Sequence, residues 1–422
     1  MPRRMQKYIL VFLVSLLFLP KARAQETGIE FTHTDYLKTV TLYAFTRGER
    51  AEVRYVNPPV TDLRNAAQQM VLEFDDLRAQ YSQYKVRILH CETDWRRSNL
   101  LDMEYLSGIN EFFLSEFRVS QNTKMPYYHY RFIVPKPLVS GNFILQLFEN
   151  EEVVAQRKFW IYENQINITA ALQPARDPEF WKTHQQLDLK LDLANYRVGI
   201  PHRELKVFLR FNQNQWREVK NTDLVNSGRN VFRLQPFNNA YLFAAGNEFR
   251  YLDISSNFSR GQNVQEVIKG KPHDIFTTIQ LPRSGTNFVD AYDNDGSFVV
   301  SNRDGGDADL GSDYMNVFFR MDAGDYPEDR QPVLYGKLTD WTYVPMEPDP
   351  ETGLLQLQLT LKNGVYDFAF GLQNAATGEV DRSYFEGDFQ QTGNTCEVFV
   401  YHAVPGKRYS SLIGYQVTRR RN

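Results

Sequence analysis

Hydrophobic and polar residues alternate in short segments along most of the chain. In residues 187–193 every second residue is leucine, which is the period of a strand with one buried and one solvated face. Glycine, asparagine, aspartate and proline fill the gaps between such segments. The pattern predicts an all-β fold of tandem immunoglobulin-like or related β-sandwich domains. We expect strands at 69–74, 85–89, 130–134, 143–148, 158–162, 166–172, 187–193, 206–211, 230–234, 249–255, 275–280, 297–301, 314–320, 333–335, 354–361, 365–370, 396–401 and 412–417, and the best helical candidate is the short segment 62–69.

Breaks in this strand pattern divide the chain into modules. A polar Glu-Asn-Gln segment at 163–165 separates two expected strands, and a Pro-Arg-Ser-Gly segment at 282–285 interrupts the pattern again. We therefore expect three sandwich domains, at 25–163, 164–284 and 285–422.

The first 24 residues have the three-part layout of a secretory signal peptide. Arg3, Arg4 and Lys7 precede an apolar segment at 8–19, and the small-residue pattern Ala22-Arg23-Ala24 follows. A single membrane anchor is the alternative, but a spanning helix needs about 20 apolar residues. We expect residues 1–24 to be a signal peptide that is cleaved after Ala24, so that the mature protein is exported.

Composition and charge exclude several classes of protein. A chain that is 42% hydrophobic and 14% aromatic can bury a core and is not intrinsically disordered. Loss of the five basic residues of the signal peptide changes the formal net charge from −3 to −8. Nucleic-acid binding needs a basic face, and the single basic run, at 419–421, is more typical of a solvated tail.

Two cysteines are present, Cys91 and Cys396. Export to an oxidising compartment favours disulfides, but these residues are 305 positions apart and fall in the expected first and third modules. We expect two free, buried thiols.

Established catalytic motifs are missing from the sequence. It contains no G-x-S-x-G elbow, H-E-x-x-H, C-x-x-C or P-loop motif, and its seven histidines are scattered. Pairs of acidic residues are common, so a glycosidase dyad stays open. We expect a protein that is not an enzyme and that needs no cofactor or metal.

An acidic stretch, Asp290 to Asp309, has two interpretations. Its alternation of aspartate with glycine is typical of calcium loops, but no glutamate stands at the twelfth position of a calcium loop. Asn-Asp-Gly at 294–296 is also a turn signal before the strand 297–301. We favour the turn and leave calcium binding open.

A second pattern lies in the third module, where a strand, a Gly-x-Leu-Thr-x-Trp segment at 336–341 and two further strands follow one another. This order resembles the early-set immunoglobulin-like modules found beside glycan-active enzymes. An exposed Trp341 would stack on a sugar, whereas a buried one would pack between sheets, which is the commoner case.

Several segments form an ordered set along the chain. They are His90-Cys91-Glu92-Thr93-Asp94-Trp95, Glu104-Tyr105-Leu106-Ser107-Gly108, Tyr127-Tyr128-His129-Tyr130, Gly246-Asn247-Glu248-Phe249-Arg250-Tyr251-Leu252-Asp253 and Tyr335-Gly336-Lys337-Leu338-Thr339-Asp340-Trp341. Taken together, they resemble the plug protein family of the Bacteroidetes type IX secretion system. The likeness covers essentially the whole mature chain.

The resemblance implies a non-enzymatic periplasmic protein at the inner face of the outer membrane. Such a protein binds the periplasmic opening of the outer-membrane β-barrel translocon and seals it in the resting state, as a monomer within the complex, without inserting in the membrane and without nucleic acid. The alternative is a periplasmic glycan-binding accessory protein with an aromatic platform on the third domain. The family-motif positions serve either the core, which we favour, or the partner interface; they are His90, Cys91, Asp94, Trp95, Glu104, Tyr105, Gly108, Tyr128, Gly336 and Trp341.

Overall fold

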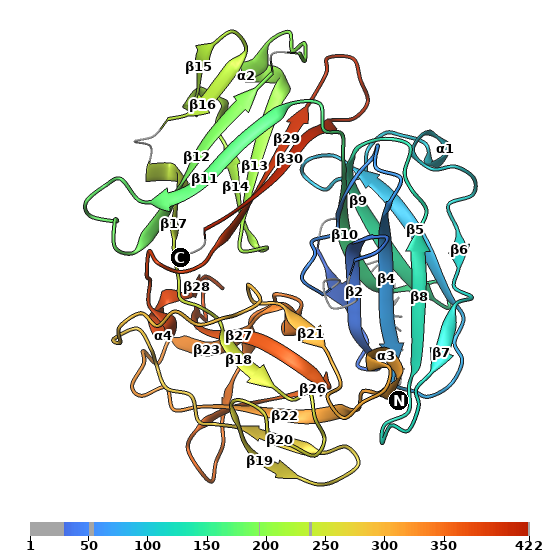
Figure 1. The fold of residues 1–422 in the computed structure, drawn as a ribbon, viewed down its shortest axis with the longest axis vertical. Coiled ribbons are helices and arrows are strands. Elements are labelled where there is room, and N and C mark those ends of the chain that lie inside the picture. Colours follow the sequence, from blue (N-terminus) through green and yellow to red (C-terminus); the bar gives the residue numbers. More distant parts are fainter. Residues whose placement is uncertain (1–28, 50–54, 194, 236–238, 421–422) are drawn as a thin grey trace, which may run out of the picture.

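The computed structural model describes residues 29–49, 55–193, 195–235 and 239–420. In these residues the chain forms three β-sandwiches, each of which borders the other two (Figure 1). The predicted all-β fold is confirmed. The predicted signal peptide, 1–24, lies outside the described residues.

The first module contains the elements β1 (Phe31–Thr32), β2 (Leu37–Thr46), β3 (Val60–Asp62), β4 (Gln68–Asp76), β5 (Tyr84–Cys91), α1 (Asp102–Tyr105), β6 (Phe112–Phe113), β7 (Phe117–Val119), β8 (Tyr128–Val134), β9 (Gly141–Glu149) and β10 (Glu152–Tyr162). One sheet has the order β1-β10-β9-β5-β6, with β3 beside β10, and the other has the order β2-β4-β8-β7. Alternate residues of both sheets form the core between them, for example Leu72 and Phe74 of β4 against Ile88 of β5 and Phe143 of β9.

The prediction of a helix at 62–69 is wrong. This segment is the end of β3, a turn and the start of β4. The Asp62 carboxylate accepts the Arg64 N–H at 2.8 Å, and the Asn65 side chain accepts the Ala67 N–H at 3.0 Å. Such side-chain bonds to the backbone compete with helix formation and favour turns.

The second module contains the elements β11 (Asn167–Pro174), β12 (His184–Asp192), α2 (Pro201–Glu204), β13 (Leu205–Phe211), β14 (Gln215–Val219), η2 (Asn221–Asp223), β15 (Leu224–Gly228), β16 (Val231–Leu234), η3 (Asn239–Tyr241), β17 (Leu242–Ala244), β29 (Thr395–His402) and β30 (Ser411–Arg419). Its sheets have the orders β11-β12-β16-β15, with β17 beside β12, and β14-β13-β29-β30. The alternating leucines of β12 point into the core between these sheets.

The third module contains the elements β18 (Arg250–Asp253), β19 (Val264–Ile268), β20 (Asp274–Thr277), β21 (Phe298–Val300), α3 (Ala308–Gly311), β22 (Tyr314–Met321), β23 (Arg330–Tyr335), η4 (Lys337–Thr339), β24 (Val344–Pro345), β25 (Glu347–Pro348), β26 (Leu355–Lys362), β27 (Gly364–Asn374), β28 (Val380–Asp381) and α4 (Ser383–Glu386). One sheet has the order β18-β27-β23-β24, with β21 and β28 also on β27, and the other has the order β19-β20-β22-β26-β25.

The expected division into 164–284 and 285–422 does not follow the strand pairing. Strands β18 and β20 pair with β27 and β22 and so belong to the third module, although they precede residue 285. The last two strands, β29 and β30, return to the second module, where β29 pairs with β13. The third module is therefore inserted between β17 and β29, as the path of the chain in Figure 1 shows.

The turn predicted at 294–296 is confirmed. The Ser297 N–H donates to the Asn294 carbonyl at 3.0 Å, and Asp295 and Gly296 have φ angles of 53° and 78°. A tight turn with two positive φ angles favours aspartate or asparagine followed by glycine. Strand β21 then begins at Phe298.

In the described part of the chain, no helix has both the length and the apolar character needed to span a bilayer.

Candidate functional site: the polar contact between the first and third modules

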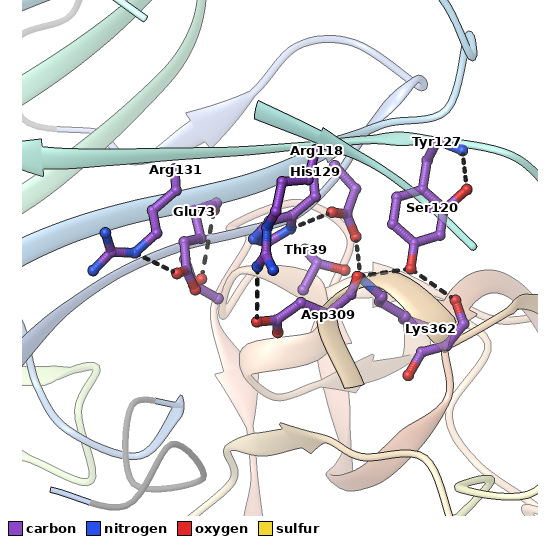
Figure 2. Close-up of polar contacts among 12 residues, drawn as sticks. Thr39, Glu73, Arg118, Ser120, Tyr127, His129, Arg131, Asp309 and Lys362 are labelled. Carbon is purple, nitrogen blue, oxygen red and sulfur yellow. Dashed lines mark hydrogen bonds and ion pairs between the residues drawn. The ribbon is translucent and has the colours of Figure 1, made fainter. Parts of the chain in front are cut away.

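A buried cluster of polar side chains joins the first module to the third. The Asp75 carboxylate of β4 contacts His129 Nδ1 of β8 through Oδ1 at 2.8 Å. Its Oδ2 accepts from Lys362 Nζ of β26 at 2.7 Å and from the Tyr314 hydroxyl of β22 at 2.6 Å. All four side chains are almost completely buried. Figure 2 shows His129, Arg118 and Tyr127 of the first module above Asp309 and Lys362 of the third.

The position of Asp75 follows from the alternation of β4. Leu72 and Phe74 face the sandwich core, so Asp75 faces outward from that sheet, where β22 and β26 of the third module cover it. Burial by itself would raise the pKa of Asp75, but Lys362 and His129 outweigh burial and hold the pKa below its ordinary value. Asp75 is therefore a carboxylate that completes a buried ion pair.

Around this cluster, the segment 307–313 of the third module meets the β7–β8 region of the first. The Tyr127 hydroxyl donates to the Asp309 carbonyl at 2.7 Å (Figure 2). Lys124 Nζ pairs with Asp313 at 3.2 Å, and Arg118 pairs with Asp307 at 3.1 Å. The C-terminal part of the acidic stretch thus contributes to a contact between modules.

A second polar contact joins the same two modules beside the first strand of the chain. Arg157 of β10 is 5% exposed and donates to the Asp340 carboxylate at 2.8 Å. The same guanidinium donates to the carbonyls of Phe31 and Val40. Lys337 Nζ donates to the Tyr55 carbonyl. Two separate charged contacts therefore fix the orientation of the third module on the first.

The second module is held to the first by an aromatic cluster. Trp160 of β10 packs against Phe399 of β29 and Trp216 of β14, and the Arg210 guanidinium lies 4.6 Å from the Trp160 ring centroid. Arg210 also forms a bidentate pair with Glu397, at 2.6 and 2.7 Å. The first module therefore contacts both of the others.

Three predicted positions belong to the core of the first module. His90 is buried, contacts the Ser98 hydroxyl at 2.8 Å and has a pKa that burial lowers to about 4. Cys91 is buried and free, and burial raises its pKa to about 12. The Tyr105 hydroxyl donates to the Asp102 carboxylate at 2.6 Å. Cys396 is also buried and free, so the prediction of two free, buried thiols is confirmed.

Two other predicted positions lie near the second module. Trp95 is half-buried with its ring edge-on to Trp160, at a centroid distance of 5.2 Å, and Lys158 Nζ lies 4.4 Å from its ring centroid. Glu104 pairs with Arg408 of the loop between β29 and β30. These residues contribute to the contact between the first and second modules.

Three further predicted positions lie at the surface of the first module. Asp94 is exposed and pairs with its neighbour Arg96 at 2.6 Å. Gly108 is exposed with a φ angle of 95°. Tyr128 of β8 is half-buried, and its ring centroid lies 5.7 Å from that of Phe117 on the edge strand β7. The structure does not bring the ten predicted positions together into one site.

The last two predicted positions, Gly336 and Trp341, belong to the third module. Gly336 has a φ angle of 154°, and a Cβ there would come within 2.8 Å of the Asp367 carbonyl. Trp341 is half-buried, edge-on to Phe249 and in contact with Gly296. Trp341 follows Asp340, which forms the second polar contact with Arg157.

Sequence reasoning missed the ion pair of the buried cluster, Asp75 and Lys362. Asp75 breaks the apolar pattern at the end of a strand, and Lys362 does the same at the end of another. A charged residue at an expected buried position is a recognisable signal. The sequence does not indicate that Asp75 and Lys362 pair with each other, because 287 positions separate them.

Among the described residues, no group of three or more histidine, cysteine, aspartate or glutamate side chains is arranged to hold a metal ion. The carboxylates of the acidic stretch instead accept backbone and side-chain hydrogen bonds. Asp293 accepts the N–H groups of Phe249 and Asp295, and Asp295 accepts from the Thr395 hydroxyl.

Comparison with known proteins identifies the first module. Residues 37–163 match the family model of the type 9 secretion system plug protein 1st domain. No curated protein matches the chain. The crystal structure of a hypothetical protein from Parabacteroides merdae ATCC 43184 is similar over 93% of this chain and 99% of that one, with a TM-score of 0.86 and 24% sequence identity. This similarity establishes a shared fold across all three modules.

Two other solved structures are only distantly similar. The C-terminal domain of the Streptococcus pyogenes antigen I/II-family protein AspA has a TM-score of 0.17 and 9% identity, over 90% of this chain and 99% of that one. A DUF4784 family protein from Bacteroides caccae ATCC 43185 has a TM-score of 0.15 and 8% identity, over 92% and 100%. Neither similarity carries an argument about this chain.

Proposed function

We propose that this chain, a member of the type 9 secretion system plug family by its first module, binds the periplasmic opening of the outer-membrane β-barrel translocon and seals it at rest. The family match at 37–163 is the observation that carries the proposal. The matched segment includes both sheets of the first module except β1. In this role the protein works by binding, without catalysis, in the periplasm at the inner face of the outer membrane.

The buried contacts between the modules support this role. A seal must keep its shape while the barrel presses on it, and a stable contact of this kind buries about 1,200–2,000 Å². The Asp75–Lys362 pair fixes how the first and third modules meet, because a shift that left either charge buried without its partner would cost about 3–5 kcal/mol. Three sandwiches held in this way provide a broad and rigid surface.

The position of Trp341 favours the plug over the alternative, a glycan-binding accessory protein. A sugar-binding platform needs an aromatic face that is open to solvent. Trp341 is half-buried, with one edge against Phe249 and with Gly296 in contact with its ring. This placement is more typical of an aromatic ring that packs against its own module.

Co-purification tests the binding step. The tagged mature protein, residues 25–422, is used to capture partners from outer membranes solubilised in mild detergent, and the partners are identified by mass spectrometry. We expect one very large β-barrel protein in near-stoichiometric amount. Recovery of polysaccharide-utilisation proteins alone, or of no β-barrel, would refute the proposal.

Trp341→Ala provides the matched control, because it removes the ring that the alternative function needs. Under our proposal this variant captures the same barrel as the wild type, and neither protein binds a glycan array. Glycan binding by the wild type that is lost in Trp341→Ala would establish the alternative. The sealing step is measured separately as the ionic conductance of the purified barrel in a planar bilayer, which we expect the wild type to lower.

A further inference from the structure

The second and third modules are connected by two antiparallel crossings of the chain, at 245–249 and 388–394. The two crossings are hydrogen-bonded to each other. The Phe389 N–H donates to the Gly246 carbonyl at 2.8 Å, and the Gly246 N–H donates to the Asp388 carboxylate at 2.8 Å. This double connection, which we call the joint, is where the inserted third module would pivot relative to the second.

Two carboxyl groups lie inside the joint. Glu248, on the first crossing, is 5% exposed, and its carboxyl accepts the Gly393 N–H of the second crossing at 2.9 Å. Asp293, from a loop of the third module, accepts the N–H groups of Phe249 at 2.5 Å and Asp295 at 3.0 Å. Glu248 and Asp293 line the same cavity, and Asp293 bonds to the residue that follows Glu248 in the chain. Two carboxyl groups held close together in a site with little water favour one shared proton over two negative charges.

The surroundings of the pair are mostly acidic. A cavity of about 490 Å³ opens beside it and is lined by further carboxylates, Asp290, Asp295 and Glu397, as well as by Arg419 and Arg420. Asp367 of β27 also faces Asp293, and burial raises its pKa to about 8.

The nearby cations have other partners. Arg283 donates to the backbone carbonyl of Glu248 but pairs through its guanidinium with Glu386. Arg420 donates to the Gln390 side chain, and the charge of Arg419 acts on Asp295. Among the described residues, no lysine or arginine forms an ion pair with Glu248 or Asp293.

We propose that the proton shared by Glu248 and Asp293 makes the joint pH-sensitive, so that the second and third modules are held together while the pair is protonated and loosen when both groups ionise. Ionisation would place two negative charges close together at a site that water screens poorly. The repulsion between these charges would move the loop of Asp293 away from the first crossing, to which it is bonded through the Phe249 N–H. The proposal concerns a conformational property of the chain itself and does not depend on the translocon as partner.

The direction of the effect follows from proton binding. Burial, reinforced by neighbouring carboxylates, raises the pKa of Glu248 and of Asp293 above their ordinary values. The closed joint therefore binds one proton more than the open joint in the range from the ordinary carboxyl pKa, about 4, up to the raised values. In that range the equilibrium constant for opening rises by up to about tenfold for each pH unit.

Hydrogen–deuterium exchange of the full mature protein tests the proposal directly. Peptides that contain the Phe249 and Gly393 amides report on the joint, because these N–H groups donate to the two carboxyls. Exchange is followed from pH 5.5 to pH 8.5 and corrected for the intrinsic pH dependence of amide exchange. We expect the protection of both amides to fall by at least about tenfold over this range, while amides in the sheet cores keep their protection.

Glu248→Gln and Asp293→Asn are the test variants, because an amide keeps the shape of the carboxyl but cannot ionise. Either variant should make the protection at the joint independent of pH. Glu379→Gln, an exposed residue of the same module, should behave as the wild type. A wild type whose joint protection does not change with pH would refute the proposal, and so would a decline that persists unchanged in a folded Glu248→Gln or Asp293→Asn variant. Failure of translocon capture would leave these outcomes unaffected.

Discussion

Replacement of Asp75 by asparagine should destabilise the protein far more than any surface substitution at the same contact. The side chains of Asp75 and Lys362 are 1% and 2% exposed, and the Asp75 carboxylate also contacts His129 and the Tyr314 hydroxyl. The substitution leaves the Lys362 ammonium buried without a neutralising charge, beside the Asp309 carbonyl and the Tyr127 ring. Loss of one member of a buried ion pair costs about 3–5 kcal/mol, and we expect the lower end because asparagine keeps one acceptor oxygen.

The assay is urea unfolding at pH 7, followed by both fluorescence and far-ultraviolet circular dichroism. Asp307→Asn is the matched control, since Asp307 pairs with Arg118 at the rim of the same contact, where both side chains are close to half exposed. We expect this control to cost at most about 1 kcal/mol. A loss below about 1 kcal/mol for Asp75→Asn would refute the assignment of Asp75 as a structural ion-pair partner.

The same variant has an expected pH dependence. The folded pKa of Asp75 is lowered, so its contribution to stability is present above the ordinary aspartate pKa, about 4, and is lost as the pH falls through the folded value. The difference in unfolding free energy between wild type and Asp75→Asn should therefore shrink below about pH 4. The double substitution Asp75→Leu with Lys362→Met should recover much of the lost stability, because it removes both charges together.

Three further outcomes are expected. In the native protein neither cysteine should react with a thiol reagent, whereas both should react after denaturation. The reason is that Cys91 and Cys396 are free and buried, and burial raises the pKa of both thiols. Rapid reaction of the native protein would contradict this burial. Gly296→Ala should lower the melting temperature, with a cost of about 1–3 kcal/mol, because the added Cβ would lie 2.5 Å from the Trp341 ring at a φ angle of 78°; an unchanged melting temperature would show that the turn can relax. Asp367→Asn should raise the free energy of unfolding more at pH 7.5 than at pH 4.5. In the folded protein the pKa of Asp367 is raised to about 8, so the wild type loses stability as the pH rises from the ordinary aspartate pKa toward that value. Equal effects at both pH values would argue against the raised pKa.

The sequence was sufficient to predict features that depend on neighbouring residues. The leucine alternation at 187–193 predicted a half-buried strand, and β12 has this burial pattern. Asn-Asp-Gly at 294–296 predicted a turn, and the backbone adopts it. The segment 62–69 was the exception, because side-chain bonds from Asp62 and Asn65 stabilise a turn where the pattern suggested a helix.

Features that depend on distant residues were beyond the sequence alone. The breaks in the pattern placed a module boundary at 285, whereas β18 and β20 pair with strands of the third module and β29 pairs with β13 of the second. Strand pairing depends on which edges meet in space, and many partners share the same alternating pattern.

The sequence by itself determined the class of the fold, the β-sandwich character of the chain and the match of residues 37–163 to a family model, because periodicity, turn residues and ordered motifs are local properties. The tertiary structure alone decided that the third module is an insertion, that Asp75 meets Lys362, and that Glu248 and Asp293 line one cavity. Each of these contacts joins residues far apart in the chain. Its energy depends on burial and on the charges nearby, and these exist only after the modules have packed together.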